Sequence, residues 1–300
     1  MKRKAIAALI AATMVASLGT TALAEVSGDI VVCSREDGSG TRGAFIELVG
    51  VEQKDEEGNK VDMTTEAAEI TNSTAAMMTK VAGDENAIGY ISLGSLDDSV
   101  TAVAIDGAEA TVENVESGDY TLVRPFNILT MEEVSEEAQD FIDFILSEEG
   151  QAVVSENGYI ALSDTEPFAG GNVSGKIVVG GSSSVTPVME KLAEAYQEIN
   201  PDLEIEGMLR DSTTGGTSTI DGNYDIGMAS RELKEEEEEE GISSIMNAQA
   251  GIAVIVNNES GITELTTELV MEIYTGEITT WEEVTEALAA LETESEEAAE

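Results

Sequence analysis

The chain has 300 residues, of which 14 are Lys or Arg and 61 are Asp or Glu, so its formal net charge at pH 7 is −47. A balance this acidic argues against nucleic acid and anionic membrane surfaces as partners, because both are bound through basic patches. The chain has no histidine and a single cysteine. This excludes Ser-His-Asp triads, Cys-His dyads, His-ligated metals, four-cysteine metal sites and an internal disulfide framework. We expect no metal site and no cofactor.

Residues 1–24 have the pattern of an export signal. A positive start at 2–4 (KRK) precedes an apolar run over 5–18, and 22–24 (ALA) is an A-x-A cleavage site. The apolar run is too short for a transmembrane helix, and no second candidate follows it. We therefore expect an exported protein, periplasmic or extracellular at the cell envelope, with no direct membrane insertion.

Two halves of the chain begin in the same way. Residues 27–32 (SGDIVV) recur as 174–179 (SGKIVV), and each β-branched run predicts a buried strand. Each strand leads into a loop rich in Gly, Ser and Thr, at 34–41 and at 180–186, and then into an amphipathic helix. A strand, such a loop and a helix N-terminus together form an anion-binding geometry, because free backbone N–H groups and the helix dipole face the loop.

A similar pattern recurs once more, as a strand over 203–205 and a hydroxyl-rich loop over 211–216. Ser and Thr can simply cap helices, an interpretation that suits one such loop better than three. Cys33 follows the apolar run of the first strand, far from the cleavage site, and Val32 before it is larger than the small residue that a lipidation motif needs. We expect Cys33 to be a buried strand residue rather than a lipid anchor or a reactive thiol.

The remaining elements alternate between strands and helices. We expect further strands over 87–92 and 251–256, and helices over 42–48, 138–154, 188–199 and 263–274. The alternation predicts an α/β fold with parallel strands, helices on both faces, and ligands at the carboxyl ends of the strands. The acidic run 235–240 predicts a solvated helix or loop, and the acidic tail 286–300 a frayed helix or disorder.

Residues 34–42 (SREDGSGTR) resemble the signature of the phosphate-binding proteins of ABC transporters, the PstS type. Other segments are similar to that family too: 87–92 (AIGYIS), 124–125 (RP), 181–187 (GSSSVTP), 225–231 (DIGMASR), and 274–276 (YTG) with Trp281. The resemblance covers residues 26–164 and 175–285. It implies a two-lobed periplasmic-binding-protein clamshell of type II with mixed, mostly parallel sheets. It also implies a monomeric binding protein, not an enzyme, that captures inorganic phosphate (HPO4 or H2PO4) for the permease subunits of an ABC importer.

The order of the similar segments is unusual, because the middle and C-terminal part of the family precedes its N-terminal part here. We interpret this as a circular permutation in which residues 165–174 join the old termini. Lobe A is then expected at 26–123 plus 258–285, lobe B at 124–257, and the acidic tail 286–300 outside both. The two hinge crossings between the lobes are expected near 123–125 and 256–258.

The resemblance implies a set of anion-binding residues at the strand ends. Arg35 would pair with phosphate as a planar fork, and Asp37 would orient Arg35 or accept a proton from the anion. Ser39, Gly40 and Thr41 would donate hydrogen bonds from a helix N-terminus. Lobe B would add Ser183, Ser184, Thr213 and Ser230.

Ser230 departs from the best-known family members, in which an aspartate at this place accepts the proton of phosphate and repels sulfate. A serine can accept a hydrogen bond but lacks the repelling charge. A receptor for sulfate, molybdate or a similar oxyanion therefore stays an alternative, as does a surface protein that kept the fold without the ligand. A hydrolase is disfavoured because neither a base nor a metal is evident.

Plainer interpretations of the charged residues also stay open. Arg35 could form a surface salt bridge to Glu36 or Asp37. Asp37 could cap a loop, and Arg231 could pair with Glu232 or with the acidic run. The negative charge of the chain is compatible with an anionic ligand, because exposed charges are screened beyond about 8–10 Å at physiological salt.

Overall fold

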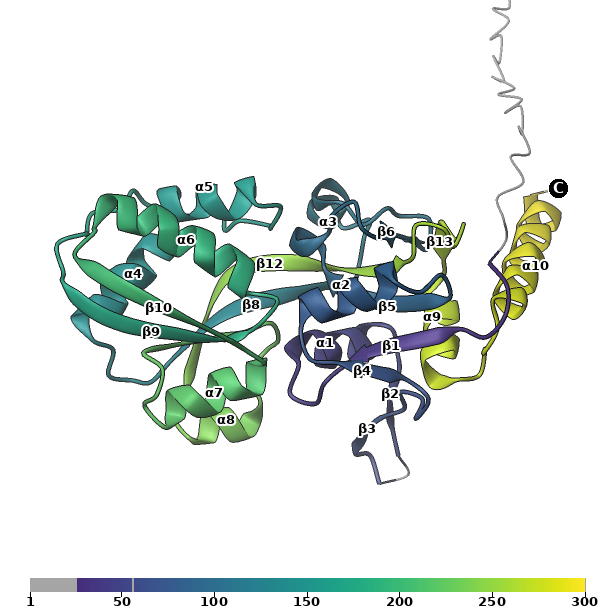
Figure 1. Ribbon diagram of the computed structural model, residues 1–300, viewed down its shortest axis with the longest axis horizontal. Coiled ribbons are helices and arrows are strands. Elements are labelled where there is room, and N and C mark those ends of the chain that lie inside the picture. Colours follow the sequence, from purple (N-terminus) through teal and green to yellow (C-terminus); the bar gives the residue numbers. More distant parts are fainter. Residues whose placement is uncertain (1–25, 56, 300) are drawn as a thin grey trace, which may run out of the picture.

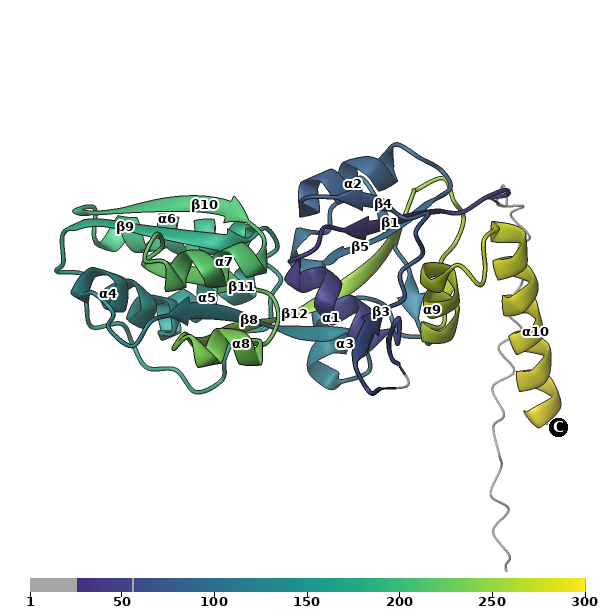
Figure 2. The same ribbon diagram turned by 90° about the horizontal axis from the view of Figure 1, so that it is seen from below.

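The computed structural model describes residues 26–55 and 57–299; the expected export signal, residues 1–24, lies outside this part of the chain. Two bodies lie end to end in Figures 1 and 2, and two long strands run between them. These strands are β8 (Val123–Thr130) and β12 (Ser243–Val256), which pair antiparallel along the whole of β8. One sheet therefore continues from one body into the other.

The described residues form a 9-stranded mixed sheet. Besides β8 and β12 it contains β1 (Val31–Arg35), β4 (Glu69–Thr71), β5 (Ala87–Ser92), β6 (Thr101–Ala102), β9 (Gly175–Ser182), β10 (Leu203–Arg210) and β11 (Ile226–Ala229). The order is β10-β9-β11-β8-β12-β5-β1-β4, with β6 beside β12. Strands β1 and β9 are parallel to their neighbours, whereas all pairings of β8 and β12 are antiparallel.

Two small sheets and a set of helices complete the fold. The small sheets pair β2 (Glu52–Lys54) with β3 (Lys60–Asp62) and β7 (Ala104–Ile105) with β13 (Glu264–Leu265). The helices are α1 (Gly40–Leu48), α2 (Thr74–Ala82), α3 (Val112–Ser117), α4 (Glu136–Ile145), α5 (Glu148–Glu156), α6 (Thr186–Ile199), α7 (Ser212–Ile220), α8 (Glu235–Glu239), α9 (Thr267–Thr275) and α10 (Trp281–Ala299), with a 3-10 turn at Leu93–Ser95. In Figure 1, α5 and α6 lie above the strands of the left-hand body and α7 and α8 below them, so helices cover both faces.

Each body has its own hydrophobic core. The first core is built from buried side chains between residues 32 and 122 and between 252 and 284. The second is built from buried side chains between 126 and 250. The parts around these two cores are called lobe A and lobe B below. Because each core is contributed by its own set of helices and strands, the two lobes pack separately and share only the crossing strands.

Most of the expected elements are confirmed, but the helix over 138–154 was wrong, and the helix expected over 263–274 begins only at Thr267, after strand β13. Over 138–154 the structure has two helices, α4 and α5, which separate at Leu146 and Ser147. Ser147 caps α5 by accepting a hydrogen bond from the Gly150 N–H at 3.2 Å. Gly150 lies so close to the Phe144 carbonyl that any side chain at this position would collide with it. The apolar periodicity continues across this break, which hides it in the sequence.

The third hydroxyl-rich segment is the start of a helix rather than a loop. Asp211 caps α7 by accepting from the Thr214 N–H at 2.8 Å, so Ser212 already lies in the first turn. Cys33 is a fully buried residue of β1, as expected, and burial raises the pKa of its thiol to about 12.

Lobe A ends in the long helix α10. Trp281 anchors its start, since the indole is fully buried and its Nε1–H donates to the Asn86 carbonyl at 3.1 Å. The helix continues to Ala299 and projects from the end of lobe A in Figure 2, so the acidic segment from residue 286 is helical as far as the structure describes it. None of the described helices combines the length and the apolar composition that a membrane crossing needs.

Candidate functional site

Buried Tyr90 fixes the end of strand β1. Its hydroxyl is hydrogen-bonded to Ser34 Oγ at 2.9 Å and accepts from the Arg35 N–H at 3.1 Å. Its ring stacks on Phe45 of α1 with the centroids 3.9 Å apart, an arrangement worth about 0.5–1.5 kcal/mol beyond the buried area. Burial raises the pKa of Tyr90 to about 12, so the hydroxyl stays neutral. The backbone that carries Arg35 is therefore held rigidly from within lobe A.

Arg35 lies buried between the lobes, with 1% of its surface exposed. Its Nε and Nη2 donate to the two carboxylate oxygens of Glu36, at 2.7 and 2.8 Å. Nη2 also donates to Ser183 Oγ of lobe B at 3.0 Å. Nη1 is buried and has no hydrogen-bond partner among the described residues. This guanidinium thus keeps charged donor capacity that the protein does not satisfy.

Asp37 does not orient Arg35, contrary to our expectation. Its carboxylate is 99% exposed and pairs with Arg42 Nη1 at 3.1 Å, whereas Glu36 holds Arg35. The reason is the turn that follows β1, in which the Ser39 N–H donates to the Glu36 carbonyl at 3.1 Å. The turn directs Asp37 outward, and Gly38 completes it at φ +89°.

The N-terminus of α1 faces lobe B. Ser39 caps the helix by accepting from the Arg42 N–H at 3.3 Å, and Gly40 and Thr41 form its buried first turn. A Cβ on Gly40 would contact Ser212 Oγ and would lie 2.8 Å from Ser230 Oγ. The backbone of α1 can approach the serines of lobe B only because residue 40 has no side chain.

Hydroxyl groups from both lobes meet beside this helix start. Thr41 Oγ1 and Ser184 Oγ are hydrogen-bonded at 2.7 Å. Thr74 Oγ1, from the first turn of α2, lies 3.3 Å from the same Ser184 Oγ. Thr74 was not among the expected site residues, because nothing in its local sequence distinguishes it from any residue that starts a helix.

Three serines of lobe B form a buried group. Ser182 Oγ donates to Ser230 Oγ at 2.9 Å, the Ser230 N–H donates to Ser212 Oγ at 3.1 Å, and the hydroxyls of Ser212 and Ser230 lie 3.4 Å apart. They come from the ends of β9 and β11 and from the start of α7. Ser182 and Ser212 lie in segments that the sequence marks as hydroxyl-rich, although neither was expected as a site residue.

Thr213 lies at the edge of the contact between the lobes. Its N–H and its hydroxyl both donate to the Gly38 carbonyl, at 3.2 and 3.3 Å. It therefore links α7 to the turn after β1 rather than facing the buried hydroxyls.

Arg231 forms a bidentate ion pair with Glu237. Two guanidinium nitrogens donate to the two carboxylate oxygens, each at 2.7 Å, and both side chains are nearly buried. Burial alone would raise the pKa of Glu237, but the hydrogen bonds from Arg231 and Lys234 outweigh it and lower this pKa. The acidic run 235–240 was expected to be solvated, and Glu237 is a correction to that expectation, because its neighbour Arg231 draws it inward.

Arg124 of β8 lies on the crossing between the lobes, with 2% of its surface exposed. Its Nη1 donates to the Ser230 carbonyl at 3.4 Å, whereas Nε and Nη2 are buried without a partner among the described residues. Burial and, after it, the nearby Arg35 lower the pKa of Arg124 to about 9. In the sequence, Arg124 was noted only because residues 124–125 are similar to the PstS-type family and lie near an expected hinge crossing.

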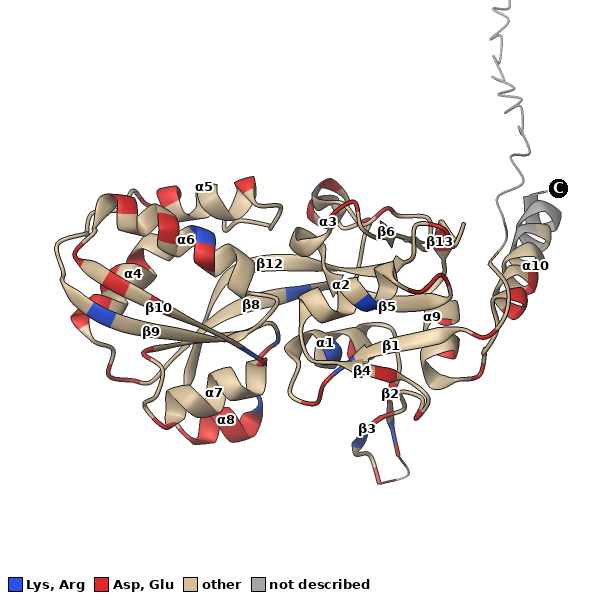
Figure 3. Ribbon diagram, in the orientation of Figure 1, with Lys and Arg blue, Asp and Glu red and all other residues tan. Residues whose placement is uncertain are grey.

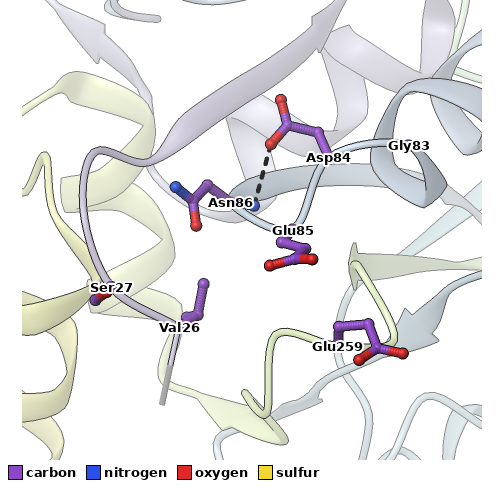
Figure 4. Close-up of a pocket in the computed structure, with 7 residues that line it drawn as sticks. All are labelled: Val26, Ser27, Gly83, Asp84, Glu85, Asn86 and Glu259. Carbon is purple, nitrogen blue, oxygen red and sulfur yellow. Dashed lines mark hydrogen bonds between the residues drawn. The ribbon is translucent and has the colours of Figure 1, made fainter. Parts of the chain in front are cut away.

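Most acidic residues lie on helices and loops at the outside of the two bodies in Figure 3. A separate pocket of about 500 Å³ lies at the start of the described chain, lined by Val26, Ser27, Gly83, Asp84, Glu85, Asn86 and Glu259 (Figure 4). Three carboxylates line that pocket, which makes it unsuitable for an anion.

Known proteins share this sequence over most of its length. The family model described as "PBP superfamily domain" matches residues 10–149 and 166–296. The phosphate-binding protein PstS 2 of Streptococcus agalactiae serotype V is 49% identical over 281 residues, which are 93% of this chain and 96% of the relative. PstS 2 of Streptococcus pneumoniae serotype 4 is 46% identical over 261 residues, which are 86% of this chain and 88% of the relative.

One solved structure is similar over its whole length. The crystal structure of a phosphate-binding protein of a phosphate ABC transporter from Streptococcus pneumoniae TIGR4 superposes with a TM-score of 0.67 at 44% sequence identity. The similar region covers 86% of this chain and 100% of that chain.

Proposed function

Because the chain belongs to the PstS-type phosphate-binding proteins of the PBP superfamily, we propose that it captures inorganic phosphate between its two lobes and delivers it to an ABC importer. It is a binding protein and not an enzyme. Relatives that carry the name phosphate-binding protein match it over nearly their whole length. The mixed α/β fold with two separate cores is the periplasmic-binding-protein clamshell that this function uses.

The observation that carries the proposal is a buried guanidinium between the lobes, that of Arg35, with an N–H donor that no described residue satisfies. Arg35 Nη1 is buried without a partner, next to a guanidinium nitrogen that bonds Ser183 across the lobes. Leaving a charged donor buried and unsatisfied costs more than the roughly 1–3 kcal/mol of a neutral group. An anion oxygen placed there would restore that hydrogen bond, and Arg is well suited to phosphate oxygens.

The proposed ligands come from both lobes. Lobe A would supply Arg35, Ser39, Gly40 and Thr41, whose helix N-terminus adds backbone N–H groups and a favourable dipole. Lobe B would supply Ser183, Ser184 and Ser230, with Thr213 at the edge. The contacts that bring these groups together between the lobes support this assignment, above all the 2.7 Å hydrogen bond between Thr41 and Ser184.

We propose two lobes with residues 165–174 as a linker, and the two hydrophobic cores support placing 26–123 in lobe A and the chain from 124 in lobe B. The expected return to lobe A at 258 is corrected, because residues 252–256 of β12 already pack in the core of lobe A whereas Ala250 packs in that of lobe B. Binding would then draw the lobes together about β8 and β12. The circular permutation relative to the best-known members of the family stays a prediction.

The finer aspects of the function are proposals as well. We propose that the protein acts as a monomer outside the cytoplasm and hands phosphate to the permease subunits of the importer. The export signal in the sequence supports the location. Membership of the chain in a family of ABC-transporter binding proteins supports the permease subunits as its partner.

Titration calorimetry of the ligand-stripped protein against phosphate tests the proposal. We expect one phosphate to bind per chain. The variant Ser39→Asp keeps a good helix cap but places a negative charge at the site, so it should abolish binding. The matched control is Ser135→Asp, which makes the same change at the cap of α4 in lobe B. Full affinity in Ser39→Asp would place the site elsewhere, and no phosphate heat from the wild type would overturn the function.

A further inference from the structure

We infer that Arg124 is a second guanidinium ligand of the bound anion, supplied by the strand that crosses between the lobes. The inference rests on the proposed phosphate-binding function. It adds a ligand that lies within strand β8, whereas the other proposed ligands lie in loops and helix starts at the ends of strands. It is carried by the burial of Arg124, by its unsatisfied donors and by its neighbours.

The first step is the hydrogen-bond account of this side chain. Arg124 is 2% exposed, yet two of its three nitrogens, Nε and Nη2, have no partner among the described residues. The third, Nη1, reaches only the Ser230 carbonyl at 3.4 Å. Buried polar groups in native proteins are nearly always hydrogen-bonded. The free edge of a guanidinium, Nε together with Nη2, is the bidentate edge that oxyanions occupy.

The second step concerns charge. Arg124 forms no ion pair with any carboxylate that the structure describes. Its charged neighbour is another cation, Arg35, and burial together with this repulsion lowers the pKa of Arg124 to about 9. An uncompensated buried charge is strongly destabilising. A phosphate dianion between the two guanidinium groups would neutralise Arg124 and the part of Arg35 that Glu36 leaves free.

A purely structural role accounts for Arg124 less well. Its guanidinium lies over the ring of Phe126 with 5.4 Å to the centroid, a cation–π contact that stabilises one face. That contact satisfies none of the N–H donors. A structural arginine buried this deeply is normally paired with a carboxylate.

The position of Arg124 has a consequence for the mechanism. It lies on β8, where Arg124 pairs with Ala250 of β12, so it belongs to the pair of strands that connects the lobes in Figure 1. An anion bound to Arg35, Ser183 and Arg124 would contact lobe A, lobe B and the crossing strand together. Binding would thereby be coupled directly to the hinge.

The test compares phosphate affinity in variants of Arg124 by titration calorimetry. Arg124→Gln should lose at least about 30-fold in affinity, the effect expected when one partner of a buried charge pair is removed. Arg124→Lys keeps the charge without the fork, so its affinity should lie between those of Arg124→Gln and the wild type. Lys176→Gln is the control, because it removes one positive charge from an exposed site on β9. Its affinity should equal that of the wild type.

The outcomes separate this inference from the function it rests on. If the wild type binds phosphate and Arg124→Gln binds equally well, the role of Arg124 is refuted and the function stands. If the wild type does not bind phosphate, both fall. Should Arg124→Gln fail to fold, a crystal structure of the wild type with phosphate decides. We expect an anion oxygen within about 3 Å of Nε or Nη2 of Arg124, and an anion beyond hydrogen-bond distance would refute the inference.

Discussion

Arg35 of lobe A donates a hydrogen bond from Nη2 to Ser183 Oγ of lobe B at 3.0 Å. The pairs Thr41–Ser184 and Thr213–Gly38 bridge the lobes in the same region. The two lobes therefore contact each other through residues that we propose as ligands of the anion. A substitution that moves the lobes apart in this region should weaken anion binding without affecting the folding of either lobe.

Gly40→Ala should weaken phosphate binding by preventing this approach. The new Cβ would collide with Ser212 Oγ and lie 2.8 Å from Ser230 Oγ, both in the other lobe. Since residue 40 is helical, alanine suits its backbone, and each lobe should fold normally. We expect a loss of affinity of at least about 10-fold, for a steric cost of roughly 1–3 kcal/mol. Calorimetry measures the affinity, and small-angle scattering should show a more open molecule with phosphate present.

Gly43→Ala is the matched control in the same helix. A Cβ there meets nothing within 4 Å, so the change should leave affinity intact and raise the stability of the fold by about 0.5–1 kcal/mol. Equal losses of affinity in the two variants would show that α1 itself, and not the contact at Gly40, is responsible.

Asp37 and Arg35 should respond differently to substitution, although they lie two residues apart. Asp37→Asn should change phosphate affinity by less than about 2-fold, because its carboxylate is 99% exposed and screened by salt. Arg35→Ala should cost at least about 30-fold, because it removes a buried charged donor from the site. Calorimetry of both variants distinguishes these outcomes. A large loss in Asp37→Asn would restore the role that the sequence suggested for this residue.

Local patterns in the sequence predict where the candidate site lies. The apolar runs 30–32 and 177–179, each followed by small hydroxyl residues and a helix, predict strand ends that can face an anion. The structure places Arg35 and Ser183, from the ends of these two strands, in direct contact. The family resemblance added that the two ends face each other, which no local pattern contains.

The positions of several side chains at the candidate site depend on tertiary contacts and could not be predicted from the sequence. Glu36 and Asp37 are adjacent carboxylates, and only the turn after β1 determines which of them meets Arg35. Arg124 is an ordinary strand residue in the sequence, and only the fold pairs it with Ala250 of β12 and brings its guanidinium to the Ser230 carbonyl. Thr74 reaches Ser184 because α2 packs beside β1, a relationship between segments far apart in the chain.

Glu237→Gln should destabilise lobe B at neutral pH. The carboxylate accepts two charged hydrogen bonds from Arg231, so its loss should cost about 2 kcal/mol. Because these bonds lower the pKa of Glu237 in the folded state, its contribution is present above the ordinary value of 4.5 and is lost as the pH falls through the lowered value. Thermal unfolding at several pH values should show the two proteins converging in acid. A difference that persists unchanged there would contradict this account.

The carboxylates beside the site are all committed to other partners. Both oxygens of Glu36 bind Arg35, and both oxygens of Asp211 bind Thr214. Asp37 faces solvent beside Arg42, and Glu237 is paired with Arg231. Within the described residues, hydroxyl groups such as those of Ser182 and Ser230 are left as acceptors for a proton on the anion.

Sulfate should therefore compete with phosphate for this site. A buried acceptor that needs the proton of phosphate would be left unpaired by sulfate and would reject it by about 10⁴-fold or more. A serine hydroxyl can rotate and donate instead of accept, so neither anion leaves it unpaired. We expect phosphate to be preferred by less than about 100-fold. Calorimetric displacement of phosphate by sulfate, and of sulfate by phosphate, gives the ratio. Complete exclusion of sulfate would mean that a carboxylate turns into the site when the anion binds.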